Sequence, residues 1–150
     1  MLGLVLFDLG NLHTQIGDYR QAEHLEEEAL KITLNALGKS HPEYAMIISG
    51  LGRLAQLQGN LDKADSLFQE SLQVRIKTLG KRHPYYPGGL SELASVYLDK
   101  NQPNTAYPLL TEALAAQINL EGPRHSSVAM TLQQMALCKL LEAQYAAAIS

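Results

Sequence analysis

The chain repeats itself at a fixed interval of 42 residues. Three full copies cover residues 9–50, 51–92 and 93–134, and partial copies cover residues 1–8 and 135–150. A gap-free repeat of this length predicts stacked supersecondary units, because one unit cannot bury its apolar face alone. We therefore expect a single array over residues 1–150. Columns that keep one residue type in every full copy include Leu9/Leu51/Leu93, Ala22/Ala64/Ala106, Leu25/Leu67/Leu109, Leu30/Leu72/Leu114, Gly38/Gly80/Gly122 and His41/His83/His125.

Turn-forming residues interrupt each copy at two places. The first is Gly17-Asp18, which recurs as Gly59-Asn60 and Asn101-Gln102. Glycine and asparagine tolerate the left-handed backbone that ends a helix, and aspartate or asparagine can cap the next one. The second is Leu-Gly-x-x-His-Pro at residues 37–42 and 79–84. A glycine that closes one helix and a proline that opens another are typical of helix ends.

Between these breaks the apolar residues recur at helical spacing. Ala22, Leu25 and Ala29 follow the three-four alternation of one buried stripe, and no stretch has the pattern of a strand. The pattern predicts an all-α fold of antiparallel helix pairs, with about seven helices and a C-terminal stub. Pro87-Gly88-Gly89 predicts a late start or a distorted first turn for the first helix of the third copy. The expected helices cover residues 2–16, 19–37, 43–58, 61–79, 90–100, 103–120 and 126–142, with the stub from residue 144.

Composition narrows the class of protein. A net charge of −3 does not favour nucleic acid or an anionic membrane as partner. No apolar run approaches the roughly 20 residues that span a bilayer. Cys138 is the only cysteine, so an internal disulfide is excluded. The lack of disulfides is compatible with a cytoplasmic location, which we expect.

No residue pattern predicts catalysis, a cofactor or a metal site. Phosphate loops, H-E-x-x-H and nucleophile elbows are absent, so we do not expect an enzyme. The corner histidines His41, His83 and His125 lie on helix pairs about 8–10 Å apart, too far to share one ion with bonds of about 2 Å. A structural role at the turn is the better interpretation. Cys138 aligns with apolar residues and is expected in the core.

The acidic run at residues 26–28 has two interpretations. A solvated outer helix face is favoured, and a weak acidic patch for a basic partner is the alternative. The ends of the chain, which lack polar capping repeats, lead us to expect either a longer array or self-association through those ends.

The repeated residues resemble the tetratricopeptide repeat (TPR). The resemblance lies in Leu-Gly or Leu-Ala, then Gly-Asp or Gly-Asn, then spaced alanines and leucines. The 42-residue spacing and the Leu-Gly-x-x-His-Pro linker resemble its kinesin-light-chain-like type. The resemblance implies a right-handed superhelical solenoid whose concave groove holds peptide segments of other proteins.

The resemblance also implies that the first helix of each pair lines the groove. The paired asparagines of kinesin light chains and the Lys/Asn/Arg clamp of chaperone-binding relatives are missing here. Kinesin cargo and chaperone tails are therefore not supported as ligands. The groove candidates, carried over column by column, are Phe7, Asn11, Thr14, Met46, Ser49, Arg53, Gln56, Ser91, Ser95, Asp99, Met130 and Gln133.

The function that follows is a non-catalytic scaffold for protein–protein interaction. Its ligand would be a peptide segment or helix of unknown identity, held in the groove. The alternative is a regulatory arm of a larger effector, such as a caspase-like protease or a nucleotide-binding ATPase, whose domain lies outside these residues.

Overall fold

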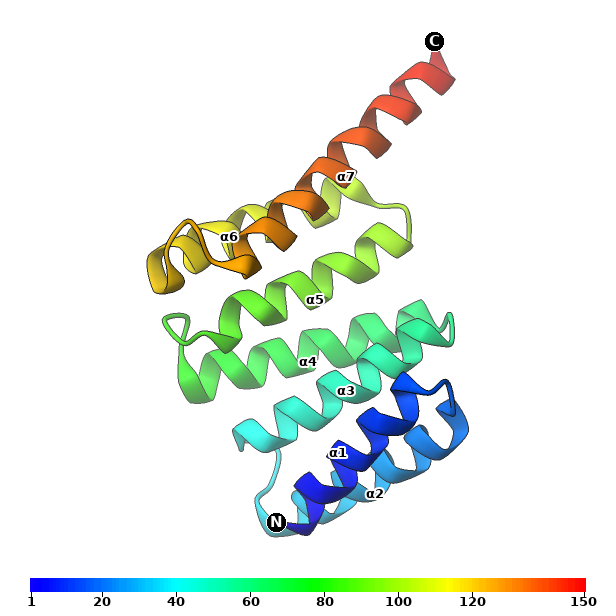
Figure 1. Ribbon diagram of the computed structural model, residues 1–150, viewed down its shortest axis with the longest axis vertical. Helices are drawn as coiled ribbons and strands as arrows, with labels where there is room; N and C mark the ends of the chain where they lie inside the picture. Colours follow the sequence, from blue (N-terminus) through cyan, green and yellow to red (C-terminus); the bar gives the residue numbers. More distant parts are fainter. The chain divides into compact units, whose positions relative to one another are not determined.

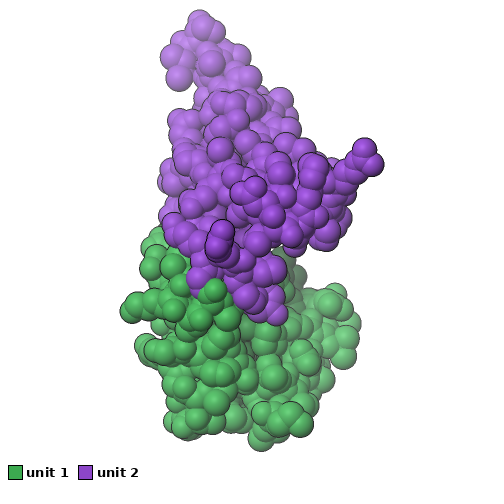
Figure 2. Space-filling model, turned by 90° about the vertical axis from the view of Figure 1, so that its left-hand side faces the viewer, with its two compact units in different colours: residues 1–79 green, residues 80–150 purple.

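The computed structural model describes residues 1–150 and consists of helices without a strand (Figure 1). The predicted all-α class is confirmed. The chain divides into two compact units, unit 1 (residues 1–79) and unit 2 (residues 80–150) (Figure 2). The helices are α1 (Leu2–Gln15), α2 (Tyr19–Ala36), α3 (Pro42–Leu57), α4 (Leu61–Leu79), α5 (Tyr85–Asp99), α6 (Pro103–Glu121) and α7 (Ser126–Ile149).

Each unit is built from antiparallel neighbours. In unit 1, α1 packs on α2 and α3 packs on α4, while α2 also contacts α3. In unit 2, α5 packs on α6, and α7 packs on α6 and touches α5. Within each unit, consecutive helices are adjacent because the loops between them are short.

The short turn within each pair has the left-handed backbone that the sequence predicts. Gly59 has φ of 81° and Asn101 has φ of 63°, the latter being the chain's one non-glycine residue with positive φ. Asn60 then caps α4, since its Oδ1 accepts a hydrogen bond from the backbone N–H of Lys63 at 3.3 Å. Asp18 caps α2 in the same way through the N–H of Gln21.

The corner histidines cap the helices that follow them. Nδ1 of His41, His83 and His125 accepts a hydrogen bond from the backbone N–H two residues further on, at 3.2, 3.2 and 3.3 Å. A free helix N-terminus leaves such N–H groups without partners. The predicted structural role of these histidines is therefore confirmed.

Helix α5 starts earlier than predicted. It begins at Tyr85 and runs through Pro87 and Gly88, whereas the sequence pattern predicted a start at residue 90. Pro87 is the third residue of the helix, where a backbone N–H would have no partner within the helix. Proline therefore costs little there, and the expected late start is wrong.

Helix α7 is not broken near residue 143. It continues to Ile149 as one helix of 24 residues, so the predicted stub is wrong. Earlier copies place glycine or asparagine at this column, but here the residue is Ala143. Alanine has the highest helix propensity and adopts the left-handed backbone only at a cost of about 1–2 kcal/mol. The helix accordingly passes straight through the position.

Small residues allow close packing within each pair. A Cβ built on Gly52 of α3 would lie 3.0 Å from the ring of Phe68 of α4. A Cβ on Gly10 would lie 3.4 Å from the backbone oxygen of Ala22. At these two positions a side chain would crowd the facing helix, which is why glycine is found there.

Cys138 is part of the core of unit 2. Its side chain is wholly buried against Ala94, Ala106 and Leu110. Burial raises the pKa of the Cys138 thiol, as expected for a structural cysteine rather than a reactive one. The predicted core position is confirmed.

A tyrosine–glutamate–lysine cluster holds the corner between α2 and α3. Tyr44 is buried and donates a hydrogen bond from Oη to Oε1 of Glu70 at 2.6 Å. Lys39 lies 3.8 Å from the same oxygen and 6.0 Å from the centre of the Tyr44 ring. Burial, followed by the hydrogen bond and charge of Glu70, raises the pKa of Tyr44. The cluster ties the linker to α4.

Unit 2 repeats this cluster at the equivalent positions. Tyr86 donates to Glu112, and Lys81 lies 3.5 Å from the Glu112 carboxylate and 5.5 Å from the centre of the Tyr86 ring. The three columns hold identical residues in the two copies, so this cluster could have been noticed in the repeat pattern of the sequence. The corner before α7 lacks it, because valine and proline occupy positions 128 and 123.

Replacing Tyr44 by phenylalanine should lower the free energy of unfolding by about 1–2 kcal/mol. The ring stays in place, but a hydrogen bond to a charged group is lost. Urea unfolding followed by circular dichroism measures the change. Tyr145→Phe is the matched control, because the Tyr145 hydroxyl is exposed and makes a long bond of 3.4 Å to the backbone. Equal loss in both variants would contradict the proposed role of the cluster.

Candidate functional site

The predicted groove residues of unit 1 fall into two groups. Phe7 and Ser49 are only 6% and 2% exposed. Phe7 packs with Ala29 and Ile47 in a core cluster. These two side chains are therefore packed inside unit 1 and do not offer atoms to a partner, which corrects their predicted role. The others reach the surface: Asn11, Thr14, Met46 and Gln56 are half-buried, and Arg53 is exposed.

Glu26 corrects the interpretation of the acidic run. Glu26 is only 1% exposed, whereas Glu27 and Glu28 are both exposed. Glu26 occupies the column that holds Phe68 and Leu110 in the next two copies. A solvated helix face is therefore wrong for this residue.

Two glycines make room for the Glu26 side chain. A Cβ on Gly10 would lie 2.7 Å from Cγ of Glu26, and a Cβ on Gly50 would lie 3.1 Å from its Oε2. That Oε2 has no hydrogen-bond partner. Burial raises the pKa of Glu26 to about 7, while the charge of Arg53 opposes the rise and that of Glu23 adds to it. The fold thus disfavours the charged form of this carboxyl group.

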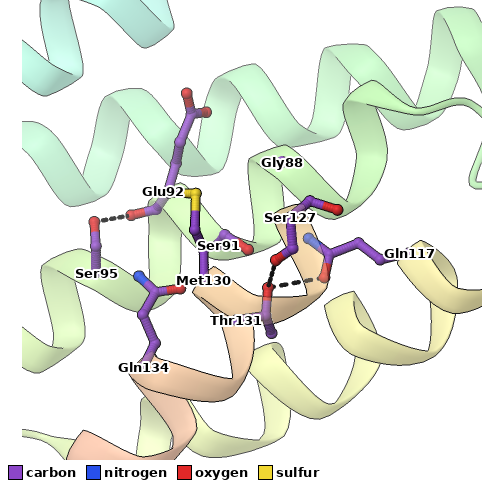
Figure 3. A pocket seen from close by; sticks show the side chains of 9 residues that line it. All are labelled: Gly88, Ser91, Glu92, Ser95, Gln117, Ser127, Met130, Thr131 and Gln134. Carbon is purple, nitrogen blue, oxygen red and sulfur yellow. Dashed lines mark hydrogen bonds between the residues drawn. The ribbon is translucent and has the colours of Figure 1, made fainter. Parts of the chain in front are cut away.

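Unit 2 contains a hollow between α5 and α7 with a volume of about 390 Å³ (Figure 3). It lies within the usual range of ligand pockets, roughly 300–1,000 Å³. Three predicted groove residues, Ser91, Ser95 and Met130, line it. We call this hollow the α5–α7 pocket; its lining consists of Gly88, Ser91, Glu92, Ser95, Gln117, Ser127, Met130, Thr131 and Gln134.

The polar groups of the α5–α7 pocket are almost all uncharged. Thr131 donates from Oγ1 to Oε1 of Gln117 at 2.8 Å, and these side chains are 1% and 5% exposed. Ser91 Oγ is buried and has no hydrogen-bond partner. Glu92 is the only charged residue of the lining, and its carboxylate extends away from Ser91 and Thr131 (Figure 3). The pocket therefore presents hydroxyl and amide groups on largely carbon walls.

Comparison of the two units shows why the pocket is open. A shift of two repeats places Phe7 at the position of Ser91 and Ile47 at the position of Thr131. In unit 1, Phe7 and Ile47 pack together, and a Cβ on Gly50 would collide with the Phe7 ring. In unit 2 a serine and a threonine replace the two large apolar side chains. The space that the Phe7 ring fills in unit 1 is therefore left open in unit 2.

The remaining candidates lie outside the pocket. Asp99 and Gln133 are exposed and do not line it, whereas Gln134, the next residue along α7, does. Gln117 was missed because it lies on α6, the second helix of its pair, whereas the resemblance assigns the groove to first helices. Thr131 was missed because the resemblance assigns the groove to other columns of the first helices. The replacement of Ile47 by Thr131 in an otherwise apolar column was the available signal.

Metal-binding and membrane-spanning features have no counterpart in the structure. No group of three or more His, Cys, Asp or Glu side chains is arranged to hold a metal ion. No helix combines the length and the apolar character needed to cross a membrane.

Comparison with known proteins supports the repeat fold. The tetratricopeptide repeat family model matches residues 2–77. Solved TPR-like repeats of a Podosopora anserina putative kinesin light chain match 93% of this chain with a TM-score of 0.84 and 25% identity. A single-substitution variant of those repeats matches with the same coverage and score and 24% identity. BtubC (BKLC) from P. vanneervenii matches 91% with a TM-score of 0.79 and 24% identity. No curated protein matches significantly.

The matched chains are longer than this one. The chain covers 66% of the two Podosopora anserina structures and 55% of BtubC. The predicted fold of kinesin-light-chain-like TPR repeats is confirmed at the level of its helices and their pairing.

Proposed function

We propose, because the chain belongs to the tetratricopeptide repeat family, that it is a non-catalytic scaffold that binds a segment of another protein. The segment would lie along the first helices of the repeats, which together would form one array over residues 1–150. A cytoplasmic protein partner, rather than nucleic acid or membrane, is part of the proposal. The observation that carries it is the α5–α7 pocket, which opens among residues that the family pattern assigns to the groove.

The exposed residues of the two units suit such binding. Arg53 in unit 1 and Met130 in unit 2 are both exposed, and Met130 is 66% exposed beside the pocket. Arginine is enriched at the energetic centres of protein interfaces, and methionine adapts its shape to irregular partners. A large exposed apolar side chain beside a pocket supports a docking role.

Peptide capture tests the proposal. A phage-displayed library of random peptides is selected on the purified chain, and the enriched peptides are measured by fluorescence anisotropy. Met130→Glu should weaken binding at least about tenfold, because it places an unpaired charge at the pocket rim. Leu132→Glu is the matched control, since Leu132 lies on the same helix, is 49% exposed and does not line the pocket.

The same peptides test the surface of unit 1. Arg53→Glu reverses an exposed charge on α3, and Lys77→Glu makes the same change on the exposed face of α4. We expect the first to weaken binding more than the second. Failure to enrich any peptide, or equal affinity of all four variants, would show that these helices do not form the binding surface.

A further inference from the structure

We propose that the α5–α7 pocket receives the carboxamide side chain of an asparagine or glutamine in the bound segment, an inference that rests on the proposed function. The pocket, at about 390 Å³, is larger than a single side chain and can therefore admit one from the partner. Its chemistry then decides which side chain enters.

A charged occupant is disfavoured by the lining. Burying an unpaired charge is costly, and a counter-charge would have to face it. The pocket contains no lysine, arginine or histidine, and its one carboxylate, on Glu92, extends away from Ser91 and Thr131 (Figure 3). Neither an anionic nor a cationic side chain would find an opposite charge beside those two hydroxyl groups.

A purely apolar occupant is also disfavoured. It would leave Ser91 Oγ, which lacks a hydrogen-bond partner within the chain, still unpaired. A buried polar atom left unpaired costs about 1–3 kcal/mol. In unit 1 apolar side chains fill the equivalent positions, since Phe7 packs on Ile47. Unit 2 has lost both large apolar groups and carries hydroxyl groups instead, so an apolar filling is not what its residues favour.

A carboxamide matches the groups that remain. It has two N–H donors and one carbonyl acceptor. The hydroxyl of Ser91 can donate or accept, and Oε1 of Gln117 can accept a second bond besides the one from Thr131. The side-chain amide of Gln134 lies on the same rim (Figure 3). The methylene groups of the ligand would lie against Met130 and the carbon walls.

Peptide selection on wild-type and altered pockets tests the assignment. The selected peptides are resynthesised with each asparagine or glutamine replaced by leucine, which keeps the size and removes the amide. On the wild-type chain, one such replacement should weaken binding at least about tenfold, because it leaves the polar groups of the pocket unpaired. Ser91→Ala combined with Thr131→Val removes the hydroxyl groups at similar volume, and should reduce that penalty to less than about threefold.

A variant in which an aromatic side chain fills the pocket provides a second test of the assignment. Ser91→Phe introduces the residue found two repeats earlier, at Phe7, and should abolish the amide preference and weaken the selected peptides. Ser66→Phe, on α4 outside the pocket, is the control for adding an aromatic side chain. Circular dichroism and thermal unfolding verify that each variant is folded. If Ser91→Phe does not fold, the Ser91→Ala and Thr131→Val pair still decides the result.

The outcomes separate the two proposals. Peptides that bind the wild-type chain but prefer charged, aromatic or aliphatic residues, or whose amides are replaced without loss, would overturn the carboxamide assignment and leave the scaffold function standing. An unaltered amide penalty in the Ser91→Ala and Thr131→Val variant would also overturn it. If no peptide binds the wild-type chain, both proposals fail.

Discussion

Replacing Glu26 by leucine should raise the free energy of unfolding at pH 8 by about 3 kcal/mol. The folded state raises the pKa of this carboxyl group from 4.5 to about 7, and each pKa unit corresponds to about 1.4 kcal/mol. The cause is its burial in a column that holds Phe68 and Leu110 in the next two copies. Leucine fits that column and has no charge to bury.

The same substitution should remove a pH dependence from the stability. In the wild-type chain the unfolded state releases the Glu26 proton near pH 4.5, whereas the folded state keeps it until about pH 7. The unfolded state therefore binds fewer protons between these values, so stability falls as pH rises through this range and is greatest below it. Above pH 7 the full penalty of the buried charge remains.

Urea unfolding at about pH 4.5, the lower edge of this range, and at about pH 8, above it, measures both effects. Glu26→Gln should remove the pH dependence as leucine does, but should stabilise less, because the amide is buried with no partner for part of its polar surface. Glu28→Leu is the control, since Glu28 lies on the same helix and is exposed. A Glu26→Leu variant that keeps the wild-type difference between the two pH values would refute the assignment.

Replacing Phe68 by alanine should lower the free energy of unfolding by about 3–5 kcal/mol. Phe68 is 2% exposed and its ring covers Gly52 on the facing helix. Removal of the ring leaves a cavity that α3 and α4 can close only in part. Leu57→Ala, at a position that is 52% exposed, should have a far smaller effect.

Gly52 and Phe68 should also show strong coupling. In the wild-type chain Gly52→Ala should cost about 1–3 kcal/mol, because the new methyl group would lie 3.0 Å from the ring. In the Phe68→Ala chain the same change should stabilise by up to about 1 kcal/mol, since alanine is the better helix former and the space is now empty. A double-mutant cycle with urea unfolding measures the difference, and additive effects would show that the two helices do not meet as described.

The helices and their order could be predicted from the sequence because they depend on local signals. Glycine, asparagine, histidine and proline mark the ends of helices in a repeating pattern, and the structure uses the histidines as caps. Prediction was wrong where a local signal was ambiguous. Pro87 suggested a helix boundary but is tolerated in the first turn, and Ala143 removed a turn that the earlier copies contain.

The site was only partly predictable from the sequence, since the pocket forms where large apolar side chains are replaced by small polar ones. The first-helix columns included Ser91, Ser95 and Met130, which line the pocket. Whether a residue of a given column lies at the surface or in the core depends, however, on the residues that face it. Phe7 is buried, whereas Ser91, in the same column two repeats later, lines the pocket. Glu26 was misplaced for a related reason. Its charged neighbours suggested a solvated face, while its own column is apolar in the next two copies.

The corner clusters and the α5–α7 pocket use different columns of the repeat. Lys39, Tyr44 and Glu70, with their counterparts in unit 2, fix the joints between helices. Ser91 and Thr131 occupy other columns and take no part in those joints. An exchange of two side chains can thus open a hollow between two helices without altering a loop or a helix length. A protein engineer could change the lining of such a hollow and leave the corner clusters as they are.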